Sequence, residues 1–215
     1  MTFLGFADGS GKAPQRPLEA PLQHGEGPDT VALQGRPVAL EGKPLRAPGQ
    51  AIAESYRQRG AAFLSGLTGS FALVIIDRSA GRVLLALDRM GIERLTYARL
   101  GEGLVFSSSA EVVSRYPGMT ASLRTQAIFG YLMLHMVPAP DTIFRDVYKL
   151  RPGTCAILEQ GTLRIERYWV PRFAADGADF QSLRDRLHES LPPAVADCEP
   201  DDRTAAFLSA GSLTS

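Results

Sequence analysis

The last residues of the chain combine small side chains with hydroxyl groups. The segment Ser209-Ala-Gly-Ser-Leu-Thr-Ser215 directly follows Ala205–Leu208, an apolar run with the length of a short strand. Small residues let backbone amides approach an anion, and a helix that begins in such a loop directs its positive end at a phosphate. The chemistry favoured here is phosphate binding, although such a run at a chain end is also typical of a flexible tail.

A second feature that could carry out chemistry is the charged pair Asp88-Arg89, which ends an apolar run and precedes Met90-Gly91-Ile92. A carboxylate and a guanidinium that leave a core strand usually bond backbone groups of the following turn. Glycine at position 91 suggests a bend that a side chain would obstruct. We interpret the pair as a structural clamp on a turn.

The other candidates for chemistry indicate no metal site. Cys155 and Cys198 are isolated thiols without metal-ligand spacing, and we expect both to stay reduced. His24 is interpreted as a solvated side chain and His135 as a bonded structural residue. Neither histidine is predicted to be a ligand.

Composition argues against nucleic-acid and membrane partners. Among the 215 residues, Lys and Arg together number 23, as do Asp and Glu, so no net field attracts a polyanion or a lipid surface. No stretch approaches the roughly 20 apolar residues of a transmembrane helix, and the N-terminus lacks the pattern of a signal peptide. The sequence therefore predicts a cytoplasmic protein.

These residues must be positioned by strands, whose apolar runs are bounded by polar or Gly-bearing turns. In chain order the expected strands are Thr2–Phe6, Thr30–Val38, Phe71–Ile76, Val83–Leu87, Leu95–Arg99, Gly103–Ser107, Ala156–Glu159 and Leu163–Arg167. The four in the middle are expected to form one buried antiparallel meander. The last two are expected to form a hairpin around Gln160-Gly161, and residues 8 to 30 read as a loop.

The spacing of apolar residues and the end signals predict three helices. One covers Gly49 to Gly60, and another covers Thr125 to Met136, begins at an N-capping Thr or Ser and ends at Pro138. The second carries two apolar lines, Ile128, Leu132 and Met136 beside Phe129 and Met133, and we expect this stripe to be core. The third begins at Phe180, has an apolar face, and is expected to stop at Pro192-Pro193.

Several motifs in this chain occur in a recognisable order. They are G-S-F-A-L-V-I-I-D at Gly69–Asp77, L-L-A-L-D-R-M-G-I at Leu84–Ile92, L-T-Y at Leu95–Tyr97, V-P-A-P-D-T-I-F at Val137–Phe144, K-L-R-P-G at Lys149–Gly153 and Y-W at Tyr168-Trp169. This order resembles the N-terminal glutaminase domain of asparagine synthetases, whose pattern includes G-x-F-A-F, A-R-D-R-x-G-x-K-P-L-Y-Y, V-P-x-P-x-T-I-F, K-L-x-P-G and Y-W. The matches are collinear from about residue 54 to the C-terminus.

The resemblance implies an α+β fold, a four-layer αββα sandwich like that of N-terminal-nucleophile hydrolases, over residues 1–170. A linker at 171–177 and the beginning of a doubly wound α/β ATP-binding synthetase domain at 178–215 are expected to follow. Because the chain ends inside that domain, we expect it to be a fragment of a longer polypeptide.

The resemblance also implies that the glutaminase site is degenerate. Thr2 stands where related amidotransferases carry a nucleophilic cysteine, and Gln34-Gly35 replaces the Asn-Gly pair of the oxyanion hole. Gly49-Gln50 replaces an Asp-Glu pair whose aspartate holds the substrate ammonium. With all three altered, we expect no retained catalytic residue and no glutamine hydrolysis.

The C-terminal segment is similar to the family's pyrophosphate loop, S-G-G-x-D-S-S. In this comparison the ATP-binding residues are Ser209, Gly211, Ser212, Thr214 and Ser215. Leu213 falls where the family aspartate helps to hold Mg²⁺, so no metal ligand is assigned. ATP and Mg²⁺ are expected cofactors of the full-length protein.

The implied function is an ATP-dependent carbon-nitrogen ligase that activates a carboxylate by adenylation. The opening Met1–Phe6 looks closest to the lasso-peptide cyclases, relatives that, like β-lactam synthetases, take the amine from the substrate itself. The substrate would then be a small molecule or a precursor peptide, with a peptidase as a possible partner. The alternatives are an asparagine synthetase dependent on glutamine or ammonia, and a non-catalytic scaffold.

Overall fold

The computed structural model describes residues 4–7, 22–24, 29–120, 122–173, 177–196 and 204–205. The chain divides into two units, Met1–Val170 and Pro171–Ser215, and each is described by itself. The division lies close to the linker expected at 171–177, which stays a prediction.

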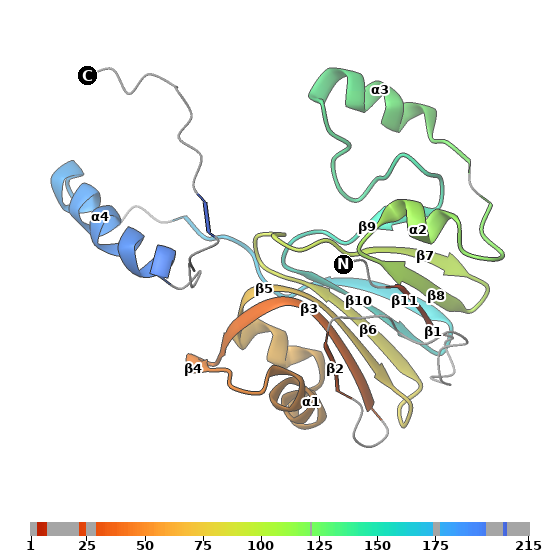
Figure 1. Ribbon diagram of the computed structural model, residues 1–215, viewed down its shortest axis with the longest axis horizontal. Helices are drawn as coiled ribbons and strands as arrows, with labels where there is room; N and C mark the ends of the chain where they lie inside the picture. Colours follow the sequence, from red (N-terminus) through yellow and green to blue (C-terminus); the bar gives the residue numbers. More distant parts are fainter. Residues whose placement is uncertain are drawn as a thin grey trace. The chain divides into compact units, whose positions relative to one another are not determined.

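Strands dominate the first unit (Figure 1). They are β1 (Leu4–Ala7), β2 (Leu22–His24), β3 (Asp29–Leu40), β4 (Lys43–Pro44), β5 (Leu67–Asp77), β6 (Arg82–Leu87), β7 (Thr96–Leu100), β8 (Gly103–Ser107), β9 (Val147–Lys149), β10 (Thr154–Glu159) and β11 (Thr162–Arg167). The helices of this unit are α1 (Pro48–Arg59), the 3₁₀ helix η1 (Gly60–Gly66), α2 (Ala110–Ser114) and α3 (Thr125–Leu134).

The strands form two sheets in which neighbouring strands run antiparallel. The smaller sheet has the order β1-β8-β7-β9, and the larger has the order β11-β10-β6-β5-β3-β2, with β4 paired to β3. β10 and β11 form the predicted hairpin, with positive φ at Gln160 and Gly161. Two consecutive residues with positive φ are typical of the tight turns that match strand twist.

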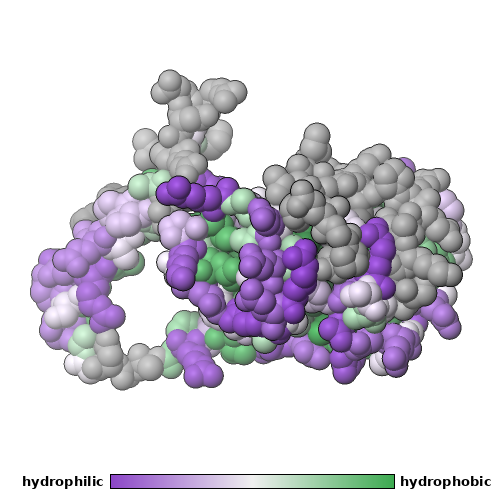
Figure 2. Space-filling view, turned by 90° about the horizontal axis from the view of Figure 1, so that it is seen from below, coloured by the Kyte–Doolittle hydropathy of each residue, from purple (hydrophilic) through white to green (hydrophobic). Residues whose placement is uncertain are grey.

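Three apolar cores separate four layers. The first lies between the sheets and includes Val74, Leu85 and Phe106; the second lies between the larger sheet and α1, and includes Ile52 and Phe71. The third packs α2 against the outer face of the smaller sheet. The layer order is helix, sheet, sheet, helix, which agrees with the αββα architecture expected from the resemblance. The visible surface on the side of α1 is mostly hydrophilic, as Figure 2 shows.

The expectation of one meander was wrong. β5 and β6 pair in the larger sheet, whereas β7 and β8 pair in the smaller one. The physical reason is that both hairpins are apolar on both faces, so each needs cover on each side. Stacking them in separate sheets provides that cover, and the segment 88–95 carries the chain from one sheet to the other.

The segment 8–30, read as a loop, contains a short strand. Leu22–His24 forms β2, which pairs with Val31–Leu33 of β3. Three residues are too few for period-two alternation to stand out, so the pattern gave no signal.

The expectation that α3 packs its apolar stripe into the core was also wrong. Ala127 is the one buried residue of α3, while Leu132 and Met133 are 69% and 68% exposed. The apolar periodicity predicts a helix, but it does not specify which element packs against that helix. The helix starts after Arg124, without a side-chain cap, and ends at Leu134 before His135 adopts the left-handed conformation.

In the second unit, α4 spans Phe180–Ala196 and includes Pro192 and Pro193, so the expected stop at these prolines was wrong. Proline keeps a helical φ, and the backbone continues for one turn without the two hydrogen bonds that these residues cannot donate. Of the strand expected at Ala205–Leu208, Ala205 has no regular structure and the rest lies outside the described residues. Among the helices that the structure describes, none is long and apolar enough to cross a membrane.

Asp77 at the end of β5 predicts a specific acid sensitivity. Burial acts to raise the pKa of this carboxyl, but hydrogen bonds from Ser79, Ala80 and Tyr56 outweigh it and hold the pKa below its usual range. Such a group contributes stability that is present above its unfolded pKa of about 4 and is lost as the pH falls through the folded value. We expect Asp77→Asn to flatten the fall of unfolding free energy below about pH 4, measured by urea denaturation. An unchanged slope, equal to that of the exposed control Glu102→Gln, would contradict this role.

Candidate functional site

Two adjoining hollows lie at one end of the sandwich, beside the crossover from β6 to β7. The larger, about 730 Å³, is lined by the end of β6 at Leu87, by Lys149 of β9 and by the segment around Met136. The smaller, about 320 Å³, is lined by Gln34, Ile92, Glu93, Arg94, Ser108 and Ser109. Glu93, Arg94, Ser108 and Ser109 line both, so the two hollows form one candidate site.

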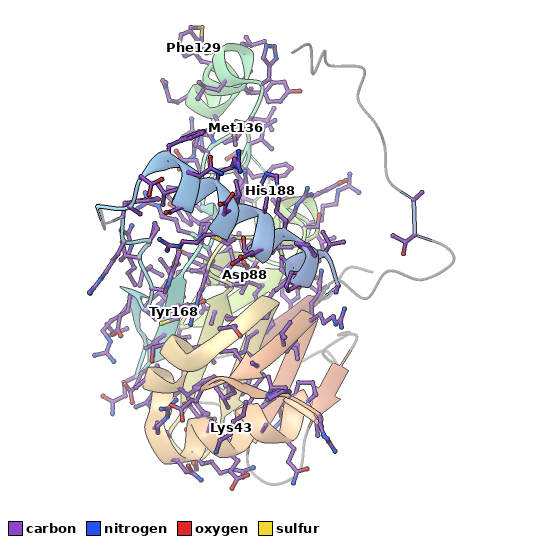
Figure 3. All side chains as sticks on the ribbon, turned by 90° about the vertical axis from the view of Figure 1, so that its left-hand side faces the viewer. Lys43, Asp88, Phe129, Met136, Tyr168 and His188 are labelled. Carbon is purple, nitrogen blue, oxygen red and sulfur yellow. The ribbon has the colours of Figure 1, made fainter. Side chains whose placement is uncertain are left out.

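The crossover is held in place by Asp88, its first residue, which is labelled in Figure 3. The buried Asp88 carboxylate accepts hydrogen bonds from the backbone N–H groups of Met90, Ile92 and Glu93 at 2.9, 3.1 and 2.9 Å. Gly91 has a φ of +68°, and a Cβ there would lie 2.7 Å from Pro152. The predicted clamp is therefore present.

Arg89 completes the clamp from the other side. Its guanidinium donates to the Ser65 carbonyl at 2.7 Å and lies 5.9 Å from the centre of the Trp169 ring. The Tyr168 hydroxyl donates to the Leu87 carbonyl at 2.5 Å, one residue before Asp88. These contacts fix the backbone that leads to Glu93.

Glu93 contacts Gln34 and Gly35, the pair that was expected to replace the oxyanion donors. Its Oε2 accepts a hydrogen bond of 2.9 Å from the Gln34 Nε2. A Cβ built on Gly35 would lie only 2.7 Å from Glu93 Oε1, so the carboxylate also lies against the Gly35 backbone. The Gln34-Gly35 pair is thus in contact with a negative charge that belongs to the chain itself.

Two cationic residues, Arg94 and Lys149, also line the larger hollow. Lys149 donates from Nζ to the Val137 carbonyl at 2.5 Å. Burial and the nearby Arg94 lower the pKa of Lys149, and Asp141 partly offsets them. Within the residues that the structure describes, no carboxylate forms an ion pair with Arg94. The candidate site therefore combines the carboxylates of Glu93 and Glu111 with the cationic side chains of Arg94 and Lys149.

The residues predicted from the resemblance are not all brought together. Gln34 and Gly35 lie at the site, whereas Gly49 and Gln50 are in the first turn of α1, which packs on the other face of the larger sheet, and line neither hollow. Thr2 and the proposed ATP-binding residues Ser209, Gly211, Ser212, Thr214 and Ser215 lie outside the described residues, as does Leu213.

Glu93, Arg94 and Lys149 were missed as site residues. A signal for the first two was present, because Ile92-Glu93-Arg94 stands where the family pattern has x-K-P. Glu93 reverses the charge of the family lysine, and Arg94 adds a charge in place of the proline. Lys149 had no signal of its own beyond its place in the motif K-L-R-P-G. Its place beside the crossover follows from the pairing of β9 with β7, which the sequence pattern did not indicate.

A glutamine amidotransferase domain model matches residues 47–169, more than half of the chain. The chain belongs to this family. Most of the matched range lies in the first unit's sandwich, and it includes Asp88, Glu93 and Lys149. Gln34 precedes it, so the contact between Glu93 and Gln34 joins the matched range to the strand before it.

The relatives of this amidotransferase domain include enzymes named as asparagine synthetases. A putative glutamine-hydrolysing asparagine synthetase of Mycobacterium tuberculosis is 31% identical over 172 residues, which cover 76% of this chain and 26% of the relative. Glutamine-hydrolysing asparagine synthetase 1 of Bacillus subtilis is 25% identical over 163 residues, covering 73% and 25%. These similarities support the resemblance to the asparagine synthetase family. The chain spans about a quarter of the length of these relatives.

A solved structure of glutamine phosphoribosylpyrophosphate amidotransferase from B. subtilis also matches the domain. It has a TM-score of 0.40 and 17% sequence identity, and the match covers 70% of this chain and 32% of that chain.

Proposed function

We propose that this amidotransferase domain does not hydrolyse glutamine. The observation that carries the proposal is the contact of the Glu93 carboxylate with Gln34 and Gly35. Amide hydrolysis passes through a tetrahedral oxyanion that hydrogen-bond donors must stabilise. At this site the Gln34 donor is already bonded to an anion, and a second negative charge beside it would be repelled.

The remaining substitutions support the same proposal. Threonine replaces cysteine at position 2, and the uncharged Gly49-Gln50 cannot neutralise a substrate ammonium. A domain without nucleophile, donor and anchor would keep a structural role in a protein that takes its amine from elsewhere.

We further propose that the full-length protein is an ATP-dependent amide-bond-forming ligase in the cytoplasm. A carboxylate would be joined to AMP with release of pyrophosphate, and an amine would then attack the carbonyl carbon, lose a proton and displace AMP. Ser209, Gly211, Ser212, Thr214 and Ser215 are the residues proposed to bind the phosphates of ATP, with Mg²⁺ held elsewhere. In the lasso-peptide cyclase version, both groups belong to one precursor peptide that a partner peptidase prepares.

A second candidate is an asparagine synthetase, which the names of the relatives favour as strongly as the replaced residues favour a cyclase. In that version free ammonia attacks an activated aspartate. The scaffold alternative has no specific observation in its favour.

The first experiment measures glutamate release from glutamine. We expect the purified chain to stay at the enzyme-free background, with a glutamine-hydrolysing relative as the positive control. Glu93→Gln, which removes the charge and keeps the side-chain length, should not restore activity alone, because Thr2 is also altered. Glutamate release that Thr2→Ala abolishes would overturn the proposal.

The second experiment separates the two ligases in the full-length protein. Pyrophosphate release and AMP formation would be measured with aspartate plus ammonia and, separately, with a candidate precursor peptide. A cyclase should consume only the peptide and yield a product lighter by one water, whereas a synthetase should yield asparagine. Failure of both, with intact ATP binding, would remove the ligase proposal and leave the glutaminase result standing.

A further inference from the structure

The larger hollow of the candidate site contains two cationic side chains without a counter-ion. Arg94 is exposed, and within the described ranges of the chain it forms no ion pair. Lys149 is half-buried, and its Nζ donates to an uncharged acceptor, the Val137 carbonyl. Burial lowers the pKa of Lys149, and the positive charge of Arg94 lowers it further. Two like charges that line one hollow repel each other, and a bound anion would relieve that repulsion.

Two of the three nearby carboxylates are paired with other arginines. Asp141 pairs with Arg124 at 2.7 Å, and Glu111 pairs with Arg115 at 2.8 Å. The third, Glu93, is hydrogen-bonded to a neutral amide and therefore keeps its negative charge unbalanced. Two cations set against this one carboxylate leave a single positive charge, which a ligand with one negative charge would balance.

Most of the other residues that line the larger hollow are apolar. Its volume is about 730 Å³, and its walls include Leu87, Leu95, Met136, Val137 and Leu150. Small-molecule sites typically combine such apolar walls with a few polar groups that fix the orientation of the ligand. The lining therefore suits a molecule with a charged head group and an apolar body.

We propose that this hollow binds a monoanionic carboxylate with an apolar body, whose carboxylate is held by Arg94 and Lys149. A guanidinium presents parallel N–H donors that match the two oxygens of a carboxylate, and an ammonium adds a compact positive charge. A phosphate with two negative charges fits less well, because Glu93 lines the same hollow and would repel it. A zwitterion fits less well because it leaves the positive charge unbalanced. This binding goes beyond the proposed loss of glutamine hydrolysis and does not require it.

The test is an NMR titration of the 215-residue chain with sodium hexanoate as the probe. We expect a dissociation constant of about 1 mM. Hexanamide, which lacks the charge, should bind at least about tenfold more weakly, and so should 6-aminohexanoate, which adds an ammonium. Butyl phosphate distinguishes the two kinds of anion. If it binds more tightly than hexanoate, the proposed carboxylate selectivity is overturned.

A pair of arginine variants locates the binding. Arg94→Gln should weaken hexanoate binding by at least about tenfold, because it removes the charged donor. Arg46→Gln changes an exposed arginine that lines neither hollow and should leave the affinity unchanged. Because Arg94 is exposed, we expect its variant to fold normally, and urea denaturation would check this. Equal affinities for the two variants would overturn the proposal.

A second pair of variants tests the charge balance without altering a cation. Met136 lines the hollow and is 59% exposed, so either polar replacement can be accommodated. Met136→Glu should weaken hexanoate binding more than Met136→Gln, because only glutamate adds a negative charge. No binding by the wild-type chain at about 20 mM hexanoate would overturn the inference. Glutamate release from glutamine, in contrast, would overturn the proposed function and leave a measured hexanoate affinity standing.

Discussion

Replacing Asp88 by alanine is expected to lower the free energy of unfolding by about 3 kcal/mol or more, because three backbone N–H groups lose hydrogen bonds to a buried, charged acceptor, each worth about 1.5 to 3 kcal/mol. The three donors belong to Met90, Ile92 and Glu93, which form the crossover between the sheets. Chemical denaturation of the purified chain would measure the loss.

Asp88→Asn is the matched variant. One carboxylate oxygen, Oδ1, accepts from Met90 and Ile92, and the other, Oδ2, accepts from Glu93. An amide can keep the first oxygen but must present N–H groups in place of the second. We therefore expect an intermediate loss, and an Asn variant as unstable as the Ala variant would show that charge rather than the count of acceptors decides the effect.

Gly69→Ala is expected to be similarly damaging, at about 3 kcal/mol or more. Gly69 has a φ of +99°, and a Cβ there would lie 2.5 Å from both the Arg36 carbonyl oxygen and the Val38 nitrogen. Both atoms are backbone atoms of β3 at the point where its register with β5 shifts between Pro37 and Ala39. They cannot move aside as a flexible side chain could.

Gly101→Ala provides the control for backbone strain alone. Gly101 also has a positive φ, +58°, but a Cβ there would meet nothing within 4 Å. We expect a loss of about 1 kcal/mol. Equal losses for the two variants in thermal or urea unfolding would contradict the argument that close backbone approach sets the cost at Gly69.

The strands and the turn clamp could be predicted because their signals are local. Apolar runs marked β5 and β6, and the Asp88-Arg89 pair with Gly91 marked the turn within a few residues. The partition of strands between two sheets was not predictable in this way. It depends on β10 pairing with β6, which joins residues more than 60 positions apart.

The candidate site shows the same limit. Gln34 and Gly35 were found through the resemblance, but the contact of Glu93 with Gln34 spans 59 positions and needs the crossover to bring it about. The prediction for helix α3 was partly wrong for a different reason. The apolar periodicity correctly predicted a helix, but the predicted burial of its apolar residues was wrong. Burial depends on the element that packs against the helix, which the local pattern does not specify.

The strand order determines which strands can pair before synthesis of the chain is complete. β1 pairs with β8, so the first strand cannot pair until residues about 100 positions later have been synthesised. One edge of β6 likewise stays unpaired until β10 has been synthesised. Contacts of such long separation form slowly, and an unpaired apolar edge is prone to intermolecular association while it waits. We therefore expect nascent chains that end before Thr154 to engage holding chaperones, and release to coincide with the emergence of β10 from the ribosome.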